Sequence, residues 1–293
     1  MNKKVVLFLL FTFTAFASFS QAVLQNKLDD FCKKYNAQIG VGVKIIGEKN
    51  GLYRLNETKF PMMSVYKLHL AIYVLKLVDE GKLSLMQEIQ FTEKDIFSNF
   101  GPLLEKFPSK KGKVNIFDLL NNIISYSDNN SCDLLFKLIG SPVEVEKFFH
   151  QKGFKGISIK WTEQQKHQKR SRIYENWIDL KTMTAILESL KNKKILSEGS
   201  TSLLMEFMAI NFTGGKRLSG LIPGYIVAHK TGTSDQNSKG ITEAVNDVGL
   251  IPLKNGRILI ISVFVKDSTE NEETNEKIIA EIAKICVEHF ESN

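Results

Sequence analysis

Cysteine, histidine and long apolar runs are scarce in this sequence, and each scarcity excludes a class of protein. The chain holds three cysteines and five histidines among 293 residues. No C-x-x-C pair occurs, which argues against a zinc or redox site. No H-E-x-x-H or similar ligand spacing occurs among the histidines, so we predict no metal and no cofactor. The sequence also lacks internal repeats and low-complexity segments.

One long apolar run is present, and it stands near the N-terminus. Lys3 and Lys4 precede an apolar stretch over 5–19, and a tripeptide at 20–22 with small residues at both ends closes it. The run is shorter than the roughly 20 residues that span a bilayer, so the pattern predicts a cleaved export signal over 1–22. A membrane anchor is the alternative. We expect an exported chain, periplasmic or secreted, without stable membrane insertion.

The charge balance gives little evidence for a polyanionic partner. The net charge of +7 falls to +5 without the two N-terminal lysines. The remaining charge is scattered, except that Lys110, Lys111 and Lys113 crowd one expected loop. A solvated loop explains this cluster better than a nucleic-acid site does. We therefore predict no nucleic-acid partner, and a monomer is the default expectation.

The cysteines leave one structural question open. Cys32, Cys132 and Cys286 are an odd number in an oxidising destination. Cys32 falls in the first expected helix of the mature chain and Cys286 in the last. A Cys32–Cys286 bridge is one arrangement, and three free thiols are the other.

Apolar periodicity predicts strands near both ends of the chain and helices between them. Alternating patterns predict strands over 39–45, 52–55, 225–233, 244–250 and 257–265. Asn50-Gly51 and Asn255-Gly256 are hairpin signals beside these strands. Helical spacing predicts helices over 24–35, from 64 to about 81, over 118–124, 131–139, from a capping box at 141–144, over 177–190, 198–209 and 278–290.

This order of elements predicts an α+β fold, an α-β sandwich in two parts. Segments 23–60 and 211–293 would form one α/β domain, with an antiparallel sheet of about five strands flanked by terminal helices. Residues 61–210 would form an all-α lobe. That lobe would contain a long polar loop at about 155–176, and a ligand cleft is expected between the two parts.

Three short motifs could carry chemistry. Ser64 and Lys67 stand three residues apart in PMMSVYK, so a helix beginning after Pro61 would put both on one face. A serine hydroxyl needs such a neighbouring base to become a nucleophile. Ser127 opens an S-D-N tripeptide after an apolar helix, and Lys230 opens K-T-G on the first strand after the helical block. Each motif alone is weak, and a loop serine or a solvated lysine would explain it.

Together, in this order, the motifs resemble those of serine β-lactamases and penicillin-binding proteins over nearly the whole mature chain. Glu163 lies 36 residues after Ser127 in the polar loop, where the class A β-lactamase pattern has its glutamate. Thr233 and Ser234 after K-T-G are similar to the minority branch of class A that includes extended-spectrum cephalosporinases. The resemblance implies hydrolysis of the β-lactam ring, with cephalosporins preferred.

The resemblance also implies a role for each catalytic residue. Ser64 would attack the lactam carbonyl and form an acyl-enzyme, and either Lys67 or Glu163 through a water would take its proton. Ser127 would relay a proton to the leaving nitrogen, and Glu163 would activate the water that releases the product. Backbone N–H groups of Ser64 and Thr233 would form the oxyanion hole.

Further residues would bind the substrate. Asn129 would hold the substrate's side-chain amide, while Lys230 and Thr231 would hold its carboxylate. Arg217 is a candidate second contact for that carboxylate, although a surface arginine is the alternative. His167 is also a candidate contact in the loop.

The loop departs from the usual class A pattern at three positions. His167 stands where an asparagine usually follows the glutamate, and Trp161 and Asn176 stand where an Arg–Asp pair usually closes the loop. Two rival functions share the first three motifs: a D,D-peptidase, and a non-hydrolytic β-lactam sensor that stays acylated. Glu163 favours the β-lactamase, because a positioned glutamate supports deacylation.

Overall fold

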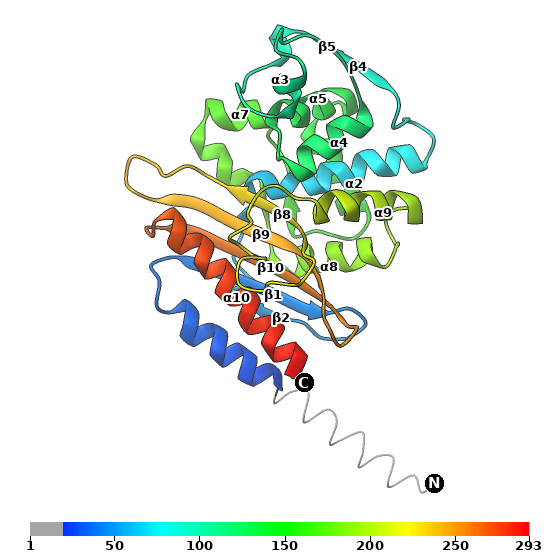
Figure 1. Cartoon of the computed structure of the whole chain (residues 1–293). Helices are drawn as coiled ribbons and strands as arrows, with labels where there is room; N and C mark the ends of the chain where they lie inside the picture. Colours follow the sequence, from blue (N-terminus) through cyan, green and yellow to red (C-terminus); the bar gives the residue numbers. More distant parts are fainter. Residues whose placement is uncertain (1–19, 293) are drawn as a thin grey trace, which may run out of the picture.

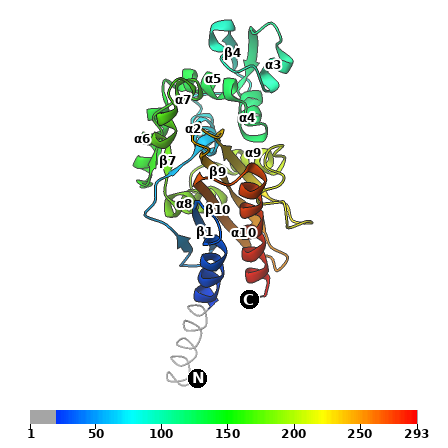
Figure 2. The same ribbon diagram turned by 90° about the vertical axis from the view of Figure 1, so that its left-hand side faces the viewer.

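The structure is a computed structural model that describes residues 20–292. Figure 1 shows a central sheet with a largely helical lobe at one end and two helices, from the two ends of the chain, along one face. The turned view in Figure 2 shows the helical lobe above the sheet. The predicted fold class is confirmed.

Five antiparallel strands form the central sheet in the order β2-β1-β10-β9-β8. Their bounds are β1 (Gln38–Ile45), β2 (Leu52–Arg54), β8 (Ala228–Thr233), β9 (Thr242–Pro252) and β10 (Ile258–Ser268). Val41 of β1 lies opposite Val263 of β10, so the sheet joins segments from the two ends of the chain. Gly256 turns between β9 and β10 with φ of 82°, which confirms that hairpin signal. Strand β8 is left at an edge of the sheet.

Helices from both ends of the chain cover one face of the sheet. The helix at 20–32 and α10 (Glu272–Ser292) share a core with the strands. Leu24 and Leu28 of the first helix and Ile278 and Ile282 of the last are completely buried in this core. The predicted export signal over 1–22 lies outside the described residues except for its last three, which belong to the first helix. Within 20–292, no helix has the length and apolar content needed to cross a bilayer.

The cysteines are free thiols, so the Cys32–Cys286 bridge is not formed. Both side chains lie in the core between the terminal helices and the sheet, where they pack as small apolar groups. Burial raises the pKa of Cys32 to about 11 and raises that of Cys286 further. Both thiols are therefore held in the protonated form, which does not undertake disulfide exchange.

A helix from the middle of the chain covers the opposite face of the sheet. Helix α8 (Leu180–Lys191) packs against β1 and β10. A Cβ atom at Gly42 of β1 would lie 3.3 Å from Leu180 Cβ and 3.1 Å from Thr184 Oγ1, so a glycine permits this close approach. Helix α9 (Glu198–Ala209) packs against β8. Both helices come from the segment expected in the helical lobe, yet both also pack against strands of the sheet.

The helical lobe is built around α2 (Tyr66–Asp79), whose first ten residues are nearly all buried. Around it pack α4 (Ile116–Ser125), α5 (Asn129–Ile139) and α6 (Pro142–Gln151). The lobe is not purely helical, which corrects the all-α prediction. Besides the helices already named, this part of the chain contains short strands, 3-10 turns and two short helices. They are β3 (Phe60–Pro61), η1 (Met63–Val65), β4 (Glu88–Phe91), η2 (Glu93–Asp95), α3 (Pro102–Lys106), β5 (Gly112–Asn115), β6 (Ile157–Ser158), α7 (Glu163–Gln168), η3 (Arg170–Glu175) and β7 (Trp177–Ile178).

Two local predictions in this lobe need correction. Pro142 occupies the first turn of α6 as predicted, but the Ser141 side chain accepts no capping hydrogen bond, so the predicted capping box is wrong. The helix expected from 177 begins only at Leu180, because Asp179 caps it by accepting a hydrogen bond from the Thr182 N–H. The preceding residues form β7, which pairs with β3 and β6.

Candidate active site

Ser64 lies in the short turn η1, which leads directly into α2. The central sheet holds this turn in place. The side chain of Asn246, on β9, donates hydrogen bonds to the carbonyl oxygens of Pro61 and Met62 at 2.8 and 3.1 Å. Met63 has a φ of 46°, a left-handed conformation that costs a non-glycine residue about 1–3 kcal/mol. Such strain persists only where surrounding contacts enforce it, so the position of Ser64 is tightly fixed.

Gly232 allows the edge strand β8 to approach this turn. A Cβ atom at Gly232 would lie 2.4 Å from the Met62 carbonyl oxygen and 3.1 Å from the Ser64 nitrogen. A side chain at this position would force the strand and the turn apart. The backbone N–H of Ser64 therefore lies against the strand that ends at Thr233.

Lys67 lies in the first turn of α2 and is completely buried. Its Nζ donates to the carbonyl oxygen of Ser127 and to Oδ1 of Asn129, both at 2.6 Å. The same Nζ lies 3.5 Å from Oε1 of Glu163. The structure thus brings three of the predicted site residues to one ammonium group.

Ser127 occupies a strained turn between two helices. Its φ of 60° is left-handed, and the next residue, Asp128, caps α5 by accepting a hydrogen bond from the Ser131 N–H at 2.8 Å. The Ser127 hydroxyl oxygen accepts hydrogen bonds from Lys230 Nζ at 3.0 Å and from Lys67 Nζ at 3.4 Å. This hydroxyl therefore lies between two lysines from different parts of the chain.

Lys230 and Thr231 reach the site from β8. Lys230 is completely buried, and burial, followed by the positive charge of Lys67, holds its pKa well below the usual value. The Thr231 hydroxyl lies 2.6 Å from the Thr213 hydroxyl, which fixes its orientation. An anion beside Lys230 would relieve the repulsion between the two ammonium groups, so the site is suited to a carboxylate.

Arg217 is also buried beside the end of β8. Its Nη2 donates to Oγ1 of Thr233 at 2.8 Å, and its Nε lies 3.2 Å from Oε1 of Glu276 in α10. The arginine is therefore not a plain surface residue. It places a positive charge behind Thr233 while part of that charge is balanced by Glu276.

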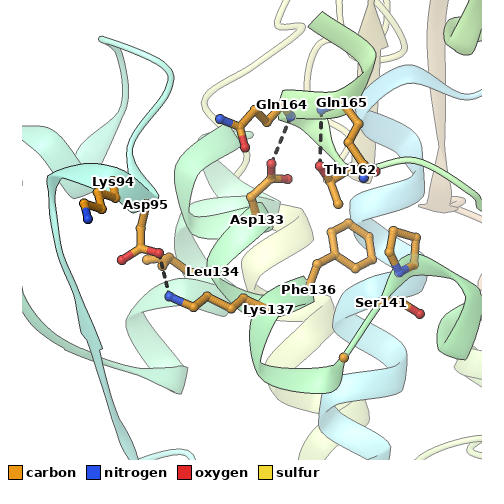
Figure 3. Close-up of a pocket in the computed structure, with 12 residues that line it drawn as sticks. Lys94, Asp95, Asp133, Leu134, Phe136, Lys137, Ser141, Thr162, Gln164 and Gln165 are labelled. Atoms are coloured by element: carbon orange, nitrogen blue, oxygen red, sulfur yellow. Dashed lines mark hydrogen bonds and ion pairs between the residues drawn. The ribbon is translucent and has the colours of Figure 1, made fainter. Parts of the chain in front are cut away.

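Glu163 is the first residue of α7, and its backbone is anchored to α5. The N–H groups of Glu163 and Gln164 donate to the two carboxylate oxygens of Asp133, at 2.8 and 2.9 Å. Thr162 and Gln165 form a reciprocal capping box at the same turn. Figure 3 shows Asp133 pointing from its helix toward this turn of the loop. Burial raises the pKa of Asp133 to about 6, although the backbone donors oppose the rise.

The Glu163 side chain is buried between two lysines. Lys166 Nζ lies 3.1 Å from Oε2, and Lys67 Nζ lies 3.5 Å from Oε1. Burial alone would raise the pKa of Glu163, but the charges of Lys166 and then Lys67 outweigh it and lower the pKa to about 2. The carboxylate is therefore ionised at neutral pH and able to accept a proton.

Comparison with known proteins covers nearly the whole described chain. A family model described as "Beta-lactamase enzyme family" matches residues 23–290. The chain is 41% identical to Beta-lactamase VEB-1 of Pseudomonas aeruginosa, covering 98% of both chains. It is 38% identical to the extended-spectrum beta-lactamase PER-1 of the same organism, covering 94% of this chain and 90% of that one. This chain belongs to the class A β-lactamases.

Solved structures of class A β-lactamases share its fold closely. The crystal structure of the TLA-1 extended-spectrum β-lactamase matches with a TM-score of 0.90 and 38% identity, covering 92% of this chain and 99% of that one. As a class A β-lactamase, the chain hydrolyses the β-lactam ring.

An amide closes the loop of this β-lactamase in place of the usual ion pair. The buried Asn176 side chain accepts hydrogen bonds from the N–H groups of Lys160 and Trp161, at 2.9 and 3.0 Å. It donates to the Trp161 carbonyl oxygen at 2.8 Å. The Arg172 guanidinium also lies 4.1 Å from the centre of the Trp161 ring. The two ends of the loop are thus joined without an Arg–Asp pair.

The structure does not bring His167 to the catalytic cluster. His167 is exposed, and its ring centre lies 5.7 Å from that of Phe97. Its neighbour Lys166 is buried against Glu163 instead. Lys166 belongs to none of the sequence motifs that mark the other site residues. The signal available was its i, i+3 spacing from Glu163, which puts both side chains on one face of a helix.

We predict that Asn176→Ala opens the loop of this β-lactamase. The change removes three hydrogen bonds and leaves buried backbone groups unpaired, each costing about 1–3 kcal/mol. We expect the free energy of unfolding to fall by about 2–4 kcal/mol and kcat to fall with it, measured by chemical denaturation and steady-state kinetics. The exposed Asn192→Ala is the matched control. Unchanged stability in Asn176→Ala would contradict this account of loop closure.

The cavity drawn in Figure 3 is separate from the catalytic cluster. Its lining includes Asp133, Thr162, Gln164 and Gln165, but not Ser64. The cavity therefore lies beside the anchor of the loop rather than at the nucleophile. Within residues 20–292, no group of three or more His, Cys, Asp and Glu side chains is arranged to hold a metal ion.

Proposed function

We propose that this β-lactamase works through an acyl-enzyme formed on Ser64 and prefers cephalosporins. The observation that carries the mechanism is the convergence on Lys67. Its Nζ contacts Ser127 and Asn129 at 2.6 Å and lies 3.5 Å from Glu163. A serine three residues before this lysine, in a fixed turn, has a base and a proton relay within its surroundings.

In the first half of the reaction, the Ser64 hydroxyl oxygen attacks the lactam carbonyl carbon, and the carbon–nitrogen bond of the ring breaks. The serine proton leaves to Lys67, or to Glu163 through a water. The two candidate bases lie 3.5 Å from one another. Ser127 then delivers a proton to the ring nitrogen, and its contacts with Lys67 and Lys230 allow that proton to be replaced.

Charge that develops on the carbonyl oxygen is stabilised by the N–H groups of Ser64 and Thr233. The close approach of β8 to η1 at Gly232 supports this assignment, because it brings the two backbone segments together. Each such donor is worth about 3–4 kcal/mol in the transition state. A rigid hole of this kind needs no rearrangement at the moment of reaction.

The substrate is bound by groups on both sides of Ser64. Lys230 and Thr231 hold its carboxylate, and Arg217 adds a positive charge through its contact with Thr233. Asn129 offers its side-chain amide to the amide of the substrate's acyl side chain, while its oxygen stays on Lys67. His167 is exposed, so in substrate binding it would contact only those groups of the substrate that extend toward the solvent.

In the second half, Glu163 takes a proton from a water that attacks the ester carbonyl carbon. The ester bond to Ser64 breaks, and the proton returns to the serine oxygen. Its position beside Lys67 supports this role. A carboxylate that is ionised at neutral pH is ready to act as this base.

We predict that kcat/KM for cephalosporins exceeds that for penicillins by at least about tenfold, or about 1.4 kcal/mol. The proposal rests on a loop closed by Asn176 rather than an ion pair, and on relatives whose names include "extended-spectrum". Steady-state measurements on matched pairs that share an acyl side chain test it. Higher kcat/KM values for the penicillins would contradict the preference.

The same assay separates the mechanism from its rivals. A chromogenic cephalosporin supplied in large excess should be consumed completely, because each acyl-enzyme is hydrolysed. A D,D-peptidase or a sensor would release about one equivalent of chromophore per protein and then stop. A single-turnover burst of this kind, with no later turnover, would contradict the proposed function.

We also propose the setting in which the enzyme works. The sequence pattern at 1–22 supports export to the periplasm or the exterior, with cleavage of the signal. A monomer is the simplest assembly that contains the whole catalytic cluster, since every residue assigned above belongs to one chain. The division into an α/β domain over 23–60 and 211–293 and a lobe over 61–210 is supported by the joining of both chain ends in one sheet.

A further inference from the structure

Lys166 is a buried lysine that the reaction described above does not use. It lies in α7, three residues after Glu163, and only 4% of its side chain is exposed. Lysine is almost never buried to this extent unless its charge is paired, because an unpaired buried ammonium is costly. The position of Lys166 therefore requires an explanation in terms of its partners.

Its ammonium group has two partners within the part of the chain that the structure describes. Nζ lies 3.1 Å from Oε2 of Glu163 and 4.4 Å from the ring centre of Tyr66. Tyr66 is completely buried and immediately precedes Lys67 at the start of α2. Lys166 thus connects the helix that carries the general base to the helix that carries the catalytic lysine.

The two lysines divide the Glu163 carboxylate between them. Lys67 faces Oε1 at 3.5 Å, and Lys166 faces Oε2 at 3.1 Å. Lys67 is also bound to Ser127 and Asn129, so its charge is shared among several acceptors. Lys166 Nζ lies closer to the Glu163 carboxylate than Lys67 Nζ does, and its other contact is the neutral ring of Tyr66.

We propose that Lys166 is a positioning residue for the general base: it holds Oε2 of Glu163, which leaves Oε1 facing Lys67, and it keeps the carboxylate ionised in acid solution. This inference rests on the proposed role of Glu163 in deacylation. The lysine itself touches neither the lactam nor the water in this account, and it acts through the carboxylate.

The other titratable groups around the carboxylate are consistent with this role. On α2 they are Tyr66 and Lys67, and on α5 they are Cys132 and Asp133. Burial raises the pKa values of Tyr66 and Cys132 well above their usual values, so both stay neutral. Asp133 is negative above about pH 6 and disfavours a second negative charge nearby. Lys230 on β8 contributes a more distant positive charge, weakened by its own lowered pKa.

The expected sign of the effect follows from these charges. Lys166 favours the ionised form of Glu163, so the pKa of the carboxyl group is lower with the lysine than without it. Deacylation needs the ionised form, and its rate falls as the pH drops through this pKa. Removing the charge of Lys166 should therefore move the acid limb of the deacylation rate to higher pH.

The test is a titration of the Glu163 carboxyl carbon by NMR in enzyme labelled with ¹³C-glutamate, followed from about pH 8 to about pH 1.5 so that the wild-type midpoint is reached. Its signal is assigned by its loss in Glu163→Gln. We expect Lys166→Met to raise the midpoint by at least about 1 pH unit, equivalent to about 1.4 kcal/mol. Lys166→Arg, which keeps the charge, should stay within about 0.5 unit of the wild type. The exposed Lys169→Met is the matched control.

Rate measurements connect the titration to catalysis. The acid limb of kcat should shift upward by the same amount in Lys166→Met and return in Lys166→Arg, whereas a purely structural role would lower the melting temperature without moving the limb. If Lys166→Met does not fold, Lys166→Gln replaces it with the same expectation. An unchanged Glu163 midpoint in a folded, uncharged variant would overturn the proposal. A shifted midpoint in an enzyme that fails to deacylate would instead contradict the proposed function alone.

Discussion

Ser64→Ala should abolish covalent capture of β-lactams and lower kcat/KM by about 10⁴- to 10⁶-fold. The reason is that no other hydroxyl is placed in the fixed turn between Lys67 and β8. The substitution removes one atom from a partly exposed side chain, so the free energy of unfolding should change by no more than about 0.5 kcal/mol. Hydrolysis of a chromogenic cephalosporin measures the first effect, and chemical denaturation measures the second.

The binding groups remain in this variant, which makes the result specific. Lys230 and Thr231 are unchanged, so a β-lactam should still bind reversibly and protect the variant against unfolding. Ser202→Ala, at an exposed position of α9, is the matched control and should keep full activity. A Ser64→Ala enzyme that retained turnover would show that another residue is the nucleophile.

Glu163→Gln should acylate but deacylate about 10²- to 10⁴-fold more slowly, the usual contribution of a general base. The amide keeps the shape of the side chain but cannot take a proton from water. The charges of Lys67 and Lys166 lose their counterion, so we also expect a lower melting temperature. Rapid mixing should show a burst of about one equivalent of product chromophore, followed by a slow steady state.

This prediction depends on which group acts as base in the first half of the reaction. A full burst at the wild-type rate would assign acylation to Lys67. If the burst in Glu163→Gln is slowed by the same factor as deacylation, Glu163 is the base in both acylation and deacylation. Glu206→Gln, at an exposed position of α9, should leave both phases unchanged. Normal steady-state turnover in Glu163→Gln would remove Glu163 from the mechanism.

The long elements of the fold could be predicted from periodicity, whereas the short ones could not. Strand β1 and helix α5 were predicted to within two residues, because each repeats apolar residues often enough to show its period. Strands β6 and β7 have two residues each, which is too few for any period. The packing of α8 on the sheet depends on Gly42, a contact between segments far apart in the chain.

The candidate site was predicted where short motifs mark it, and missed where spatial contacts define it. Ser64, Lys67 and Lys230 stand in recognisable tripeptides or tetrapeptides. Lys166 and Asp133 belong to none of these. The i, i+3 spacing puts Lys166 on the same helix face as Glu163, but spacing alone does not show that the lysine is buried. Their positions beside Glu163 follow from the packing of α7 against α5 and from the contacts of Lys166 with Glu163 and Tyr66.

The cysteine arrangement, which the sequence left open between a Cys32–Cys286 bridge and three free thiols, shows the same limit. Cys32 and Cys286 were correctly placed in helices at opposite ends of the chain, and these helices do share one core. Periodicity shows that both residues face a core, but it does not show whether their sulfur atoms can bond. The packing between the helices decides this, and the thiols are free.

Mass spectrometry of Glu163→Gln after a brief exposure to a cephalosporin tests the central claim most directly. The account predicts an intact mass increased by one acyl group, with the adduct on the peptide that contains Ser64 and with slow loss over time. The same treatment of wild-type enzyme should leave little adduct, because Glu163 clears it. An adduct on another residue, or no adduct in a folded variant that still consumes the drug, would contradict the account.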